Sequence, residues 1–236
     1  DRICDTLYLE MYAVAMQLLA DANINAQIRL ATPNRLREYQ AILSLRDMQT
    51  SYPFINYIGL HNLSLGNSAS LKWGVSYDRD KDIHQLISGQ STYRHLQTLP
   101  RQVLSLSGQT ESVVSFVFET LVPSGKSVYG AISININASY LQDLLTTYTK
   151  ASGVSMQIYN ENAVLLAENN DSDLLGVNWT ADILPTKSGA FTKEINGERY
   201  YIACSTENDL GWTIIRTQAS SQMFHNLRTL QEITIF

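Results

Sequence analysis

The segment VVSFVFETLVPSGKSVYGAISINI, residues 113–136, decides the fold. Its two arms, 113–120 and 127–136, are rich in β-branched and aromatic residues, which favour strands. Between them, Pro123-Ser124-Gly125-Lys126 supplies residue types that build tight turns. Strands joined by a short turn pair antiparallel, because a parallel pair needs a long crossover. The segment therefore predicts a β-hairpin within an antiparallel sheet.

On the N-terminal side of this hairpin, the pattern changes from helical to strand-like at Pro53. Residues 1–30 contain neither Pro nor Gly and repeat Leu, Met and Ala at helical spacing, which predicts one long helix. Thr32 is suited to cap a second helix that begins at Pro33 and ends near Thr50. After Pro53 we expect a short helix at 80–87 and strands at 54–60, 71–77 and 101–106.

On the C-terminal side, a helix at 138–148 precedes a second group of strands. Hairpins are predicted at 154–168 and 190–206, the latter around Asn196-Gly197, which is a strong hairpin signal. A strand at 212–217 and a helix at 220–236 complete the chain. Consecutive strands joined by short turns, with helices before, between and after them, predict an α+β fold with antiparallel sheets.

Composition excludes several classes of protein. The 236 residues are 44% hydrophobic and 17% charged, as in ordinary globular proteins. A net charge of -5 provides no broad positive field for nucleic acid, so we expect none as a partner. Two cysteines, Cys4 and Cys204, exclude a disulfide framework. The apolar stretch Met11–Ala20 is too short to span a bilayer, and the missing initiator Met indicates a fragment of a longer protein.

No motif of catalysis or cofactor binding is complete. The four histidines are scattered, which argues against a zinc site. The Asp-x-Asp-x-Asp run at 78–82 resembles the start of a calcium loop, but Ile83 and Gly89 occupy the positions of its Gly and Glu. We therefore interpret it as a solvated, capped helix start. Residues 125–127 lack the rest of a phosphate-binding loop, and no Gly-x-Ser-x-Gly occurs. We predict no enzyme, metal or cofactor.

Three parts of the chain together resemble the double-Cache family of extracytoplasmic sensor regions. Residues 125–136, followed by 140–145, are similar to the last distal strand and the helix after it. Residues 156–167 are similar to the hairpin that opens the membrane-proximal module. Residues 197–203 with 210–215 are similar to its closing strands. The three parts occur in the order that the family has.

The resemblance implies two PAS-like antiparallel modules carried on a long N-terminal helix. It divides the chain into a helical stalk with a second helix at 1–52, a membrane-distal module at 53–149, a membrane-proximal module at 150–219 and a C-terminal helix at 220–236. It also implies membrane spans before Asp1 and from about Ile233, and therefore a location on the extracytoplasmic face of a bacterial membrane. The ligand is expected in the distal module.

The resemblance also suggests where a ligand would be held. In members that bind amino acids, an Arg and a Trp-Tyr pair hold the carboxylate, and an Asp near the end of the last distal strand holds the amino group. Here Tyr93-Arg94-His95 lies near the expected place of the Arg and the Trp-Tyr pair, and Asn135 replaces the Asp. Without that carboxylate an ammonium lacks its charge-assisted partner. This favours a neutral or anionic ligand, including a sugar, over an amino acid.

Ligand pockets combine apolar and aromatic walls with a few polar groups, which also points to this region. The candidate ligand-binding residues are Trp73, Tyr77, Tyr93, Arg94, Arg101, Phe116, Phe118 and Asn135. Each has a plain structural alternative. Phe116 and Phe118 share one strand face and are equally suited to a core, and the arginines are equally suited to solvent.

The expected function is a small-molecule sensor for a bacterial transmembrane receptor. The first expectation for the output is a histidine kinase or an AraC-type regulator, and a chemotaxis receptor is the alternative. Ligand binding in the distal module would shift the terminal helices, and the receptor would form a homodimer through the N-terminal helix. The ligand classes are a sugar, an organic acid or an amino acid. The alternatives are a secreted enzyme with a site built from distant residues, and a dimerisation module without a ligand.

Overall fold

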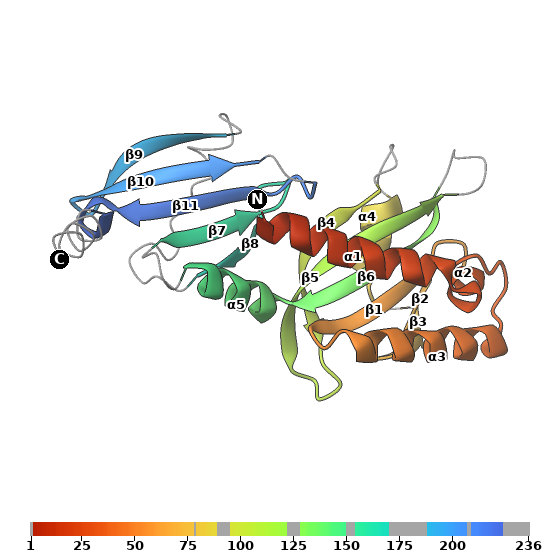
Figure 1. Ribbon diagram of the computed structural model, residues 1–236. Coiled ribbons are helices and arrows are strands. Elements are labelled where there is room, and N and C mark those ends of the chain that lie inside the picture. Colours follow the sequence, from red (N-terminus) through yellow and green to blue (C-terminus); the bar gives the residue numbers. More distant parts are fainter. Residues whose placement is uncertain are drawn as a thin grey trace, which may run out of the picture. The chain divides into compact units, whose positions relative to one another are not determined.

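The computed structural model describes residues 2–77, 79–88, 95–121, 128–149, 154–169, 188–206 and 209–223. The chain divides into two compact units, each with its own antiparallel sheet (Figure 1). The N-terminal unit comprises residues 6–138, and the C-terminal unit comprises residues 1–5 and 139–236. This confirms the predicted α+β fold class.

The N-terminal helices are α1 (Arg2–Ala20), α2 (Ala22–Ile28) and α3 (Arg35–Ser51). The prediction of one uninterrupted helix over 1–30 was wrong. The helix is interrupted at Asp21, whose carboxylate accepts hydrogen bonds from the backbone N–H of Asn23 (2.8 Å) and Ile24 (3.0 Å). Asp in this position satisfies N–H groups that a helix start leaves free, so it begins a new helix. Likewise α3 is capped by Asn34 and not by Thr32.

Helix α1 is also apolar enough to cross a membrane. Residues Ile3–Ala20 form an 18-residue window with a mean hydropathy of 1.2. Counting only Met11–Ala20 therefore underestimated the apolar segment. A helix in a protein core passes the same test, and Leu7, Met11 and Leu18 are completely or almost completely buried.

The sheet of the N-terminal unit has six strands in the order β3-β2-β1-β6-β5-β4, all antiparallel. Their bounds are β1 (Ile55–Asn62), β2 (Asn67–Ser70), β3 (Gly74–Ser76), β4 (Gln97–Leu104), β5 (Thr110–Leu121) and β6 (Val128–Asn137). The predicted hairpin is confirmed as β5 and β6, with Phe116 opposite Ile134. Its predicted turn, residues 123–126, lies outside the described residues.

The two faces of this sheet carry different residues. On β1, Tyr57 and His61 point toward α4 (Lys81–Ser88), because the Tyr57 hydroxyl and the His61 ring contact residues at that helix. Asn62 points to the opposite face, where its Nδ2 donates to the backbone carbonyls of Gln27 (3.0 Å) and Leu30 (2.9 Å). The face toward α4 is therefore rich in polar groups, and the other face packs against the N-terminal helices.

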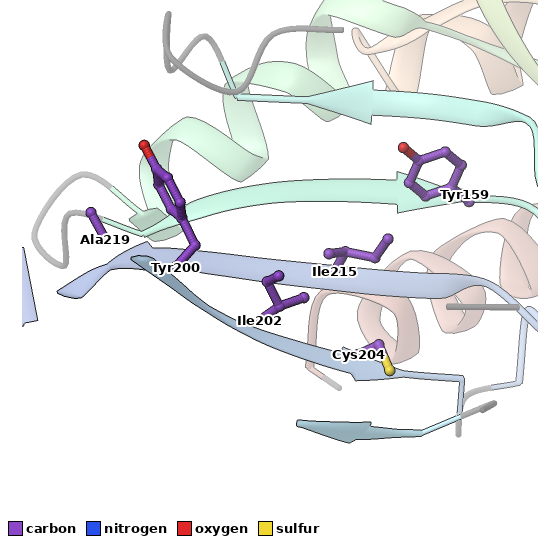
Figure 2. Packing of buried hydrophobic residues seen from close by; sticks show 6 residues of the cluster. All are labelled: Tyr159, Tyr200, Ile202, Cys204, Ile215 and Ala219. Atoms are coloured by element: carbon purple, nitrogen blue, oxygen red, sulfur yellow. The ribbon is translucent and has the colours of Figure 1, made fainter. Parts of the chain in front are cut away.

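The C-terminal unit begins with most of α5 (Ala138–Thr149) and has a five-stranded sheet. The order is β8-β7-β11-β10-β9, and every pair is antiparallel. Their bounds are β7 (Ser155–Tyr159), β8 (Leu165–Glu168), β9 (Gly189–Ile195), β10 (Glu198–Ser205) and β11 (Thr213–Ala219). Figure 2 shows the cluster of Tyr159, Tyr200, Ile202, Cys204, Ile215 and Ala219 that anchors these strands. Of the predicted last helix, residues 220–223 are helical and the rest lies outside the described residues.

Candidate ligand-binding site

A cavity of about 520 Å³ opens in the N-terminal unit, beside the face of the sheet that α4 covers. Its lining comes from β1, β4, the segment around β3 and the start of α4. The lining residues are Tyr57, Trp73, Arg79, Asp80, Lys81, Asp82, Arg101, Gln102, Val103 and Leu104. The cavity thus combines two aromatic rings with five charged side chains. This lining is more polar than that of most ligand pockets, which suits a polar or charged ligand.

Arg101 on β4 is the central cation of this site, and only 9% of it is exposed. Its Nη2 donates to Asp80 Oδ1 (2.6 Å) and Asp82 Oδ1 (2.8 Å), and its Nε donates to Asp82 Oδ2. Its Nη1 donates to the Tyr57 hydroxyl at 3.2 Å. A buried guanidinium requires such partners, because an unpaired charge in the interior is costly.

Asp80 is the buried anion that faces Arg101. Its backbone has a φ of 58°, a left-handed conformation that few residues other than glycine adopt. Only 7% of the residue is exposed, and its Oδ1 also accepts a 2.7 Å hydrogen bond from the Tyr57 hydroxyl. The interpretation of this segment as a solvated helix start was therefore wrong for Asp80, because the turn before α4 directs it inward.

The electrostatics of the site keep Asp80 and Arg101 ionised. Burial would raise the pKa of Asp80, but the Arg101 guanidinium and the hydrogen bonds from Arg101 and Tyr57 outweigh it and lower the pKa below its ordinary value. Burial would lower the pKa of Arg101, but the Asp80 carboxylate beside it raises the pKa. Burial and the nearby Asp80 carboxylate also raise the pKa of Tyr57. Tyr57 therefore stays protonated, and its hydroxyl donates a hydrogen bond to Asp80.

A polar network continues from Arg101 under α4. Arg101 Nη1 lies 3.4 Å from Asn135 Oδ1, and Asn135 Nδ2 donates to Ser133 Oγ at 3.0 Å. Ser133 Oγ is 2.8 Å from His61 Nε2, and the network continues to His84 through Ser68, at 2.9 and 3.1 Å. Burial lowers the pKa of the fully buried His61 to about 3, so its ring is neutral at neutral pH.

Comparison with known proteins decides which fold this is. No protein-family model and no curated protein sequence matches the chain. Among solved structures, the sensory domain of the Campylobacter jejuni chemoreceptor Tlp3 with isoleucine bound matches with a TM-score of 0.61 and 12% identity, over 94% of this chain and 90% of that one. The ligand-binding domain of Mlp24 with asparagine gives 0.60 and 15%, over 93% and 89%. The extracellular domain of the putative histidine kinase vpHK1S-Z8 gives 0.61 and 14%, over 96% and 89%.

The chain has the double-Cache fold. The neighbours cover nearly the whole chain, so the likeness includes both sheets. At 12–15% identity it establishes the fold and not the ligand.

The double-Cache fold brings some of the predicted site residues together and separates others. Trp73 and Arg101 line the cavity, and Asn135 contacts Arg101. Tyr77 is 55% exposed and does not line it. Phe116 and Phe118 are fully buried and alternate with Ser115 and Val117, so they point to the opposite face of the sheet. Tyr93 and Arg94 lie outside the described residues.

Sequence reasoning missed Tyr57, Asp80 and Asp82. The only signal for the two aspartates was the Asp-x-Asp spacing, which also fits an exposed helix start. Tyr57 looked like an ordinary strand residue. Within the described residues, no three His, Cys, Asp or Glu side chains lie close enough together to hold a metal ion.

A second cavity lies in the C-terminal unit and has a volume of about 400 Å³. It is formed by β9, β10 and β11, and Ala190, Thr192, Tyr201 and Ala203 are exposed members of its lining. Unlike the first cavity, its lining includes no buried ion pair among the described residues. We therefore take the cavity around Arg101 as the candidate ligand site.

Proposed function

We propose that this chain is the extracytoplasmic sensor domain of a bacterial transmembrane signalling receptor, and that it binds a small molecule in the cavity around Arg101. The observation that carries the proposal is the buried Asp80–Arg101 pair beside this cavity, in a fold shared with sensory ligand-binding domains. Buried charges beside an open cavity are a physical mark of a functional site. The domain binds its ligand without converting it.

The kinds of protein that share the fold support a signalling output for this chain. The neighbours include sensory domains of a chemoreceptor and of a putative histidine kinase. A histidine kinase or an AraC-type regulator is the proposed output of this chain. Membrane spans on either side would carry the signal from the terminal helices, and the receptor would pair through α1, where Leu9 is 63% exposed. Ligand binding shifts such an equilibrium only through different affinities for its two states.

A thermal-unfolding screen of the purified chain tests the binding function. The compounds are sugars, organic acids, amino acids and amines. A true ligand at about 100 times its Kd should stabilise the protein by about 2.7 kcal/mol and raise the Tm by several degrees. Trp73→Ala should weaken the binding of such a compound by about tenfold or more, since Trp73 lines the cavity.

The matched control is Tyr39→Ala, which removes an aromatic ring that is 60% exposed on α3 and is not part of the cavity lining. Its affinity should equal that of the wild type. If no compound raises the Tm, or if both variants bind as well as the wild type, the sensor function of this cavity is refuted. The ligand-free dimerisation module would then be favoured.

A further inference from the structure

The guanidinium of Arg101 offers nothing further to an anionic ligand. Arginine carries five N–H donors. Two of the Arg101 donors reach Asp82 and one reaches Asp80. The two on Nη1 point to the Tyr57 hydroxyl at 3.2 Å and to Ser115 Oγ and Asn135 Oδ1 at 3.5 and 3.4 Å. A ligand carboxylate could bind Arg101 only by breaking one of these bonds, and the strongest of them are charge-assisted.

Asp80, in contrast, has an acceptor to spare. Its Oδ1 accepts hydrogen bonds from Tyr57 and Arg101. Its Oδ2 is buried and accepts none from the residues that the structure describes. Only 7% of the Asp80 residue is exposed, and Asp80 belongs to the cavity lining. A buried carboxylate oxygen without a donor costs free energy, which a ligand N–H would recover.

The charges of the site leave the choice of ligand to this oxygen. The buried pair of Asp80 and Arg101 has no net charge. Asp82, Arg79 and Lys81 also line the cavity, but all three are exposed at its rim. The unmet need of the interior is therefore a hydrogen-bond donor for Asp80 Oδ2, and a carboxylate binds a charged donor more strongly than a neutral one.

Two cationic side chains already lie over the Trp73 ring, which lines the cavity. The Arg79 guanidinium lies 4.2 Å from the centre of the Trp73 ring, and Lys72 Nζ lies 5.0 Å from it. Aromatic faces attract cations through their quadrupole. Since the exposed Arg79 can move away at little cost, the ring can receive the cationic end of a ligand instead.

We propose that the cavity binds a protonated primary amine that carries no free carboxylate. The ammonium donates to Asp80 Oδ2, and the carbon chain lies against Trp73 and Val103. This inference rests on the proposed function, because it assumes that the cavity around Arg101 is the ligand site. It differs from the expectation of a neutral or anionic ligand, because Asp80 supplies the carboxylate that Asn135 does not. The neighbours with isoleucine and asparagine bind amino acids, whereas here a ligand carboxylate would have no free partner on Arg101.

Four compounds with matched carbon chains test the amine preference on the wild-type chain by calorimetry. They are n-butylamine, which is only a cation; L-norvaline, which adds a carboxylate; pentanoate, which is only an anion; and 1-butanol, which is neutral. We expect n-butylamine to bind at least about tenfold more tightly than each of the others. Equal or tighter binding of norvaline, pentanoate or butanol overturns the amine proposal and leaves the sensor function standing. So does failure of n-butylamine when another compound class binds in the screen.

Two variants then locate the ammonium. Asp80→Asn keeps the shape of the side chain and removes its charge, so it should weaken n-butylamine binding by about tenfold or more. Asp47→Asn removes the same charge from a side chain on α3 that is 80% exposed. This control should leave the affinity for n-butylamine unchanged. Circular dichroism verifies the fold of both. A folded Asp80→Asn chain with wild-type affinity overturns the proposal, and if it does not fold, the four-compound comparison decides alone.

Discussion

At the scale of single residues, a few buried polar side chains define the site. His61 is fully buried between the hydroxyls of Ser68 (2.9 Å) and Ser133 (2.8 Å), and the chain leaves room for it at Gly59. A Cβ at Gly59 would lie 2.9 Å from His61 Nε2 and 2.6 Å from Ser133 Oγ. The backbone at Gly59 therefore leaves space for the imidazole, and the burial of the ring disfavours its charged form.

This burial predicts how stability depends on pH. The unfolded chain protonates His61 below about pH 6.5, whereas the folded chain does so only near pH 3, because its pKa is lowered to about 3. The free energy of unfolding should therefore fall as the pH decreases from 6.5 to 4.5, by up to about 1.4 kcal/mol per pH unit for this residue. Denaturant unfolding at a series of pH values measures the slope.

In a His61→Gln variant the slope over this interval should decrease, although the variant itself is less stable. Leu36→Gln, which changes a side chain on α3 that is 66% exposed and carries no titratable group, is the control and should keep the slope of the wild type. A slope that His61→Gln leaves unchanged would show that His61 does not resist protonation. Part of the slope should remain in this variant, because burial also lowers the pKa of His84, and Asp80, whose pKa is lowered too, contributes below about pH 5.

Residues such as Asp80 mark where prediction from sequence ends. Trp73 and Arg101 were found because aromatic and cationic residues are typical of pockets. Asp80 was not found, because its role depends on a left-handed backbone and on Arg101, twenty-one residues later in the chain. Local patterns encode neither. Phe116 and Phe118 were identified as a pair on one strand face, but only the register of the sheet decides which face is the cavity side.

At the scale of helices and strands, local signals were sufficient where they were strong. The β5–β6 hairpin and the β9–β10 hairpin follow from runs of strand-forming residues. Strand β2 was missed, because Asn67–Ser70 consists of small and polar residues that are buried only once β2 lies between β1 and β3 in the folded sheet. The break at Asp21 was missed because neither Pro nor Gly marks it.

The β9–β10 turn gives a prediction at this scale. Asn196 and Gly197 have φ values of 53° and 82°, the positive pair that a two-residue hairpin turn requires. Gly197→Ala should therefore lower the free energy of unfolding by about 1 kcal/mol, since an L residue is strained there. Gly189→Ala is the control, because it is at the start of β9 outside the positive-φ range. Neither added Cβ would meet an atom within 4 Å.

Urea denaturation of the two variants separates backbone strain from crowding. Gly189→Ala should stay within about 0.5 kcal/mol of the wild type. Equal losses in both variants would mean that the positive φ at residue 197 is not what the turn needs.

At the scale of the whole molecule, the two units offer two different cavities. The N-terminal unit has a cavity of about 520 Å³ with a buried ion pair, and the C-terminal unit has one of about 400 Å³ on strands β9 to β11. Each unit has its own sheet. A ligand should therefore stabilise mainly the unit that it contacts. The cavity that holds the ligand can then be identified on the wild-type chain, without a variant.

Hydrogen exchange with and without a bound compound makes that measurement. For any compound that raises the Tm, amide exchange should slow in peptides from β1, α4 and β4, because the ligand ties together the elements that carry Tyr57, Asp82 and Arg101. Peptides from β9, β10 and β11 should exchange as in the free chain. Protection confined to these three strands would assign the ligand to the second cavity and would leave the buried Asp80–Arg101 pair as a purely structural feature. A ligand stabilises the protein through the groups that it contacts, so its binding free energy protects the amides of those elements first. Protection of β1, α4 and β4 and protection of β9 to β11 therefore indicate different binding sites.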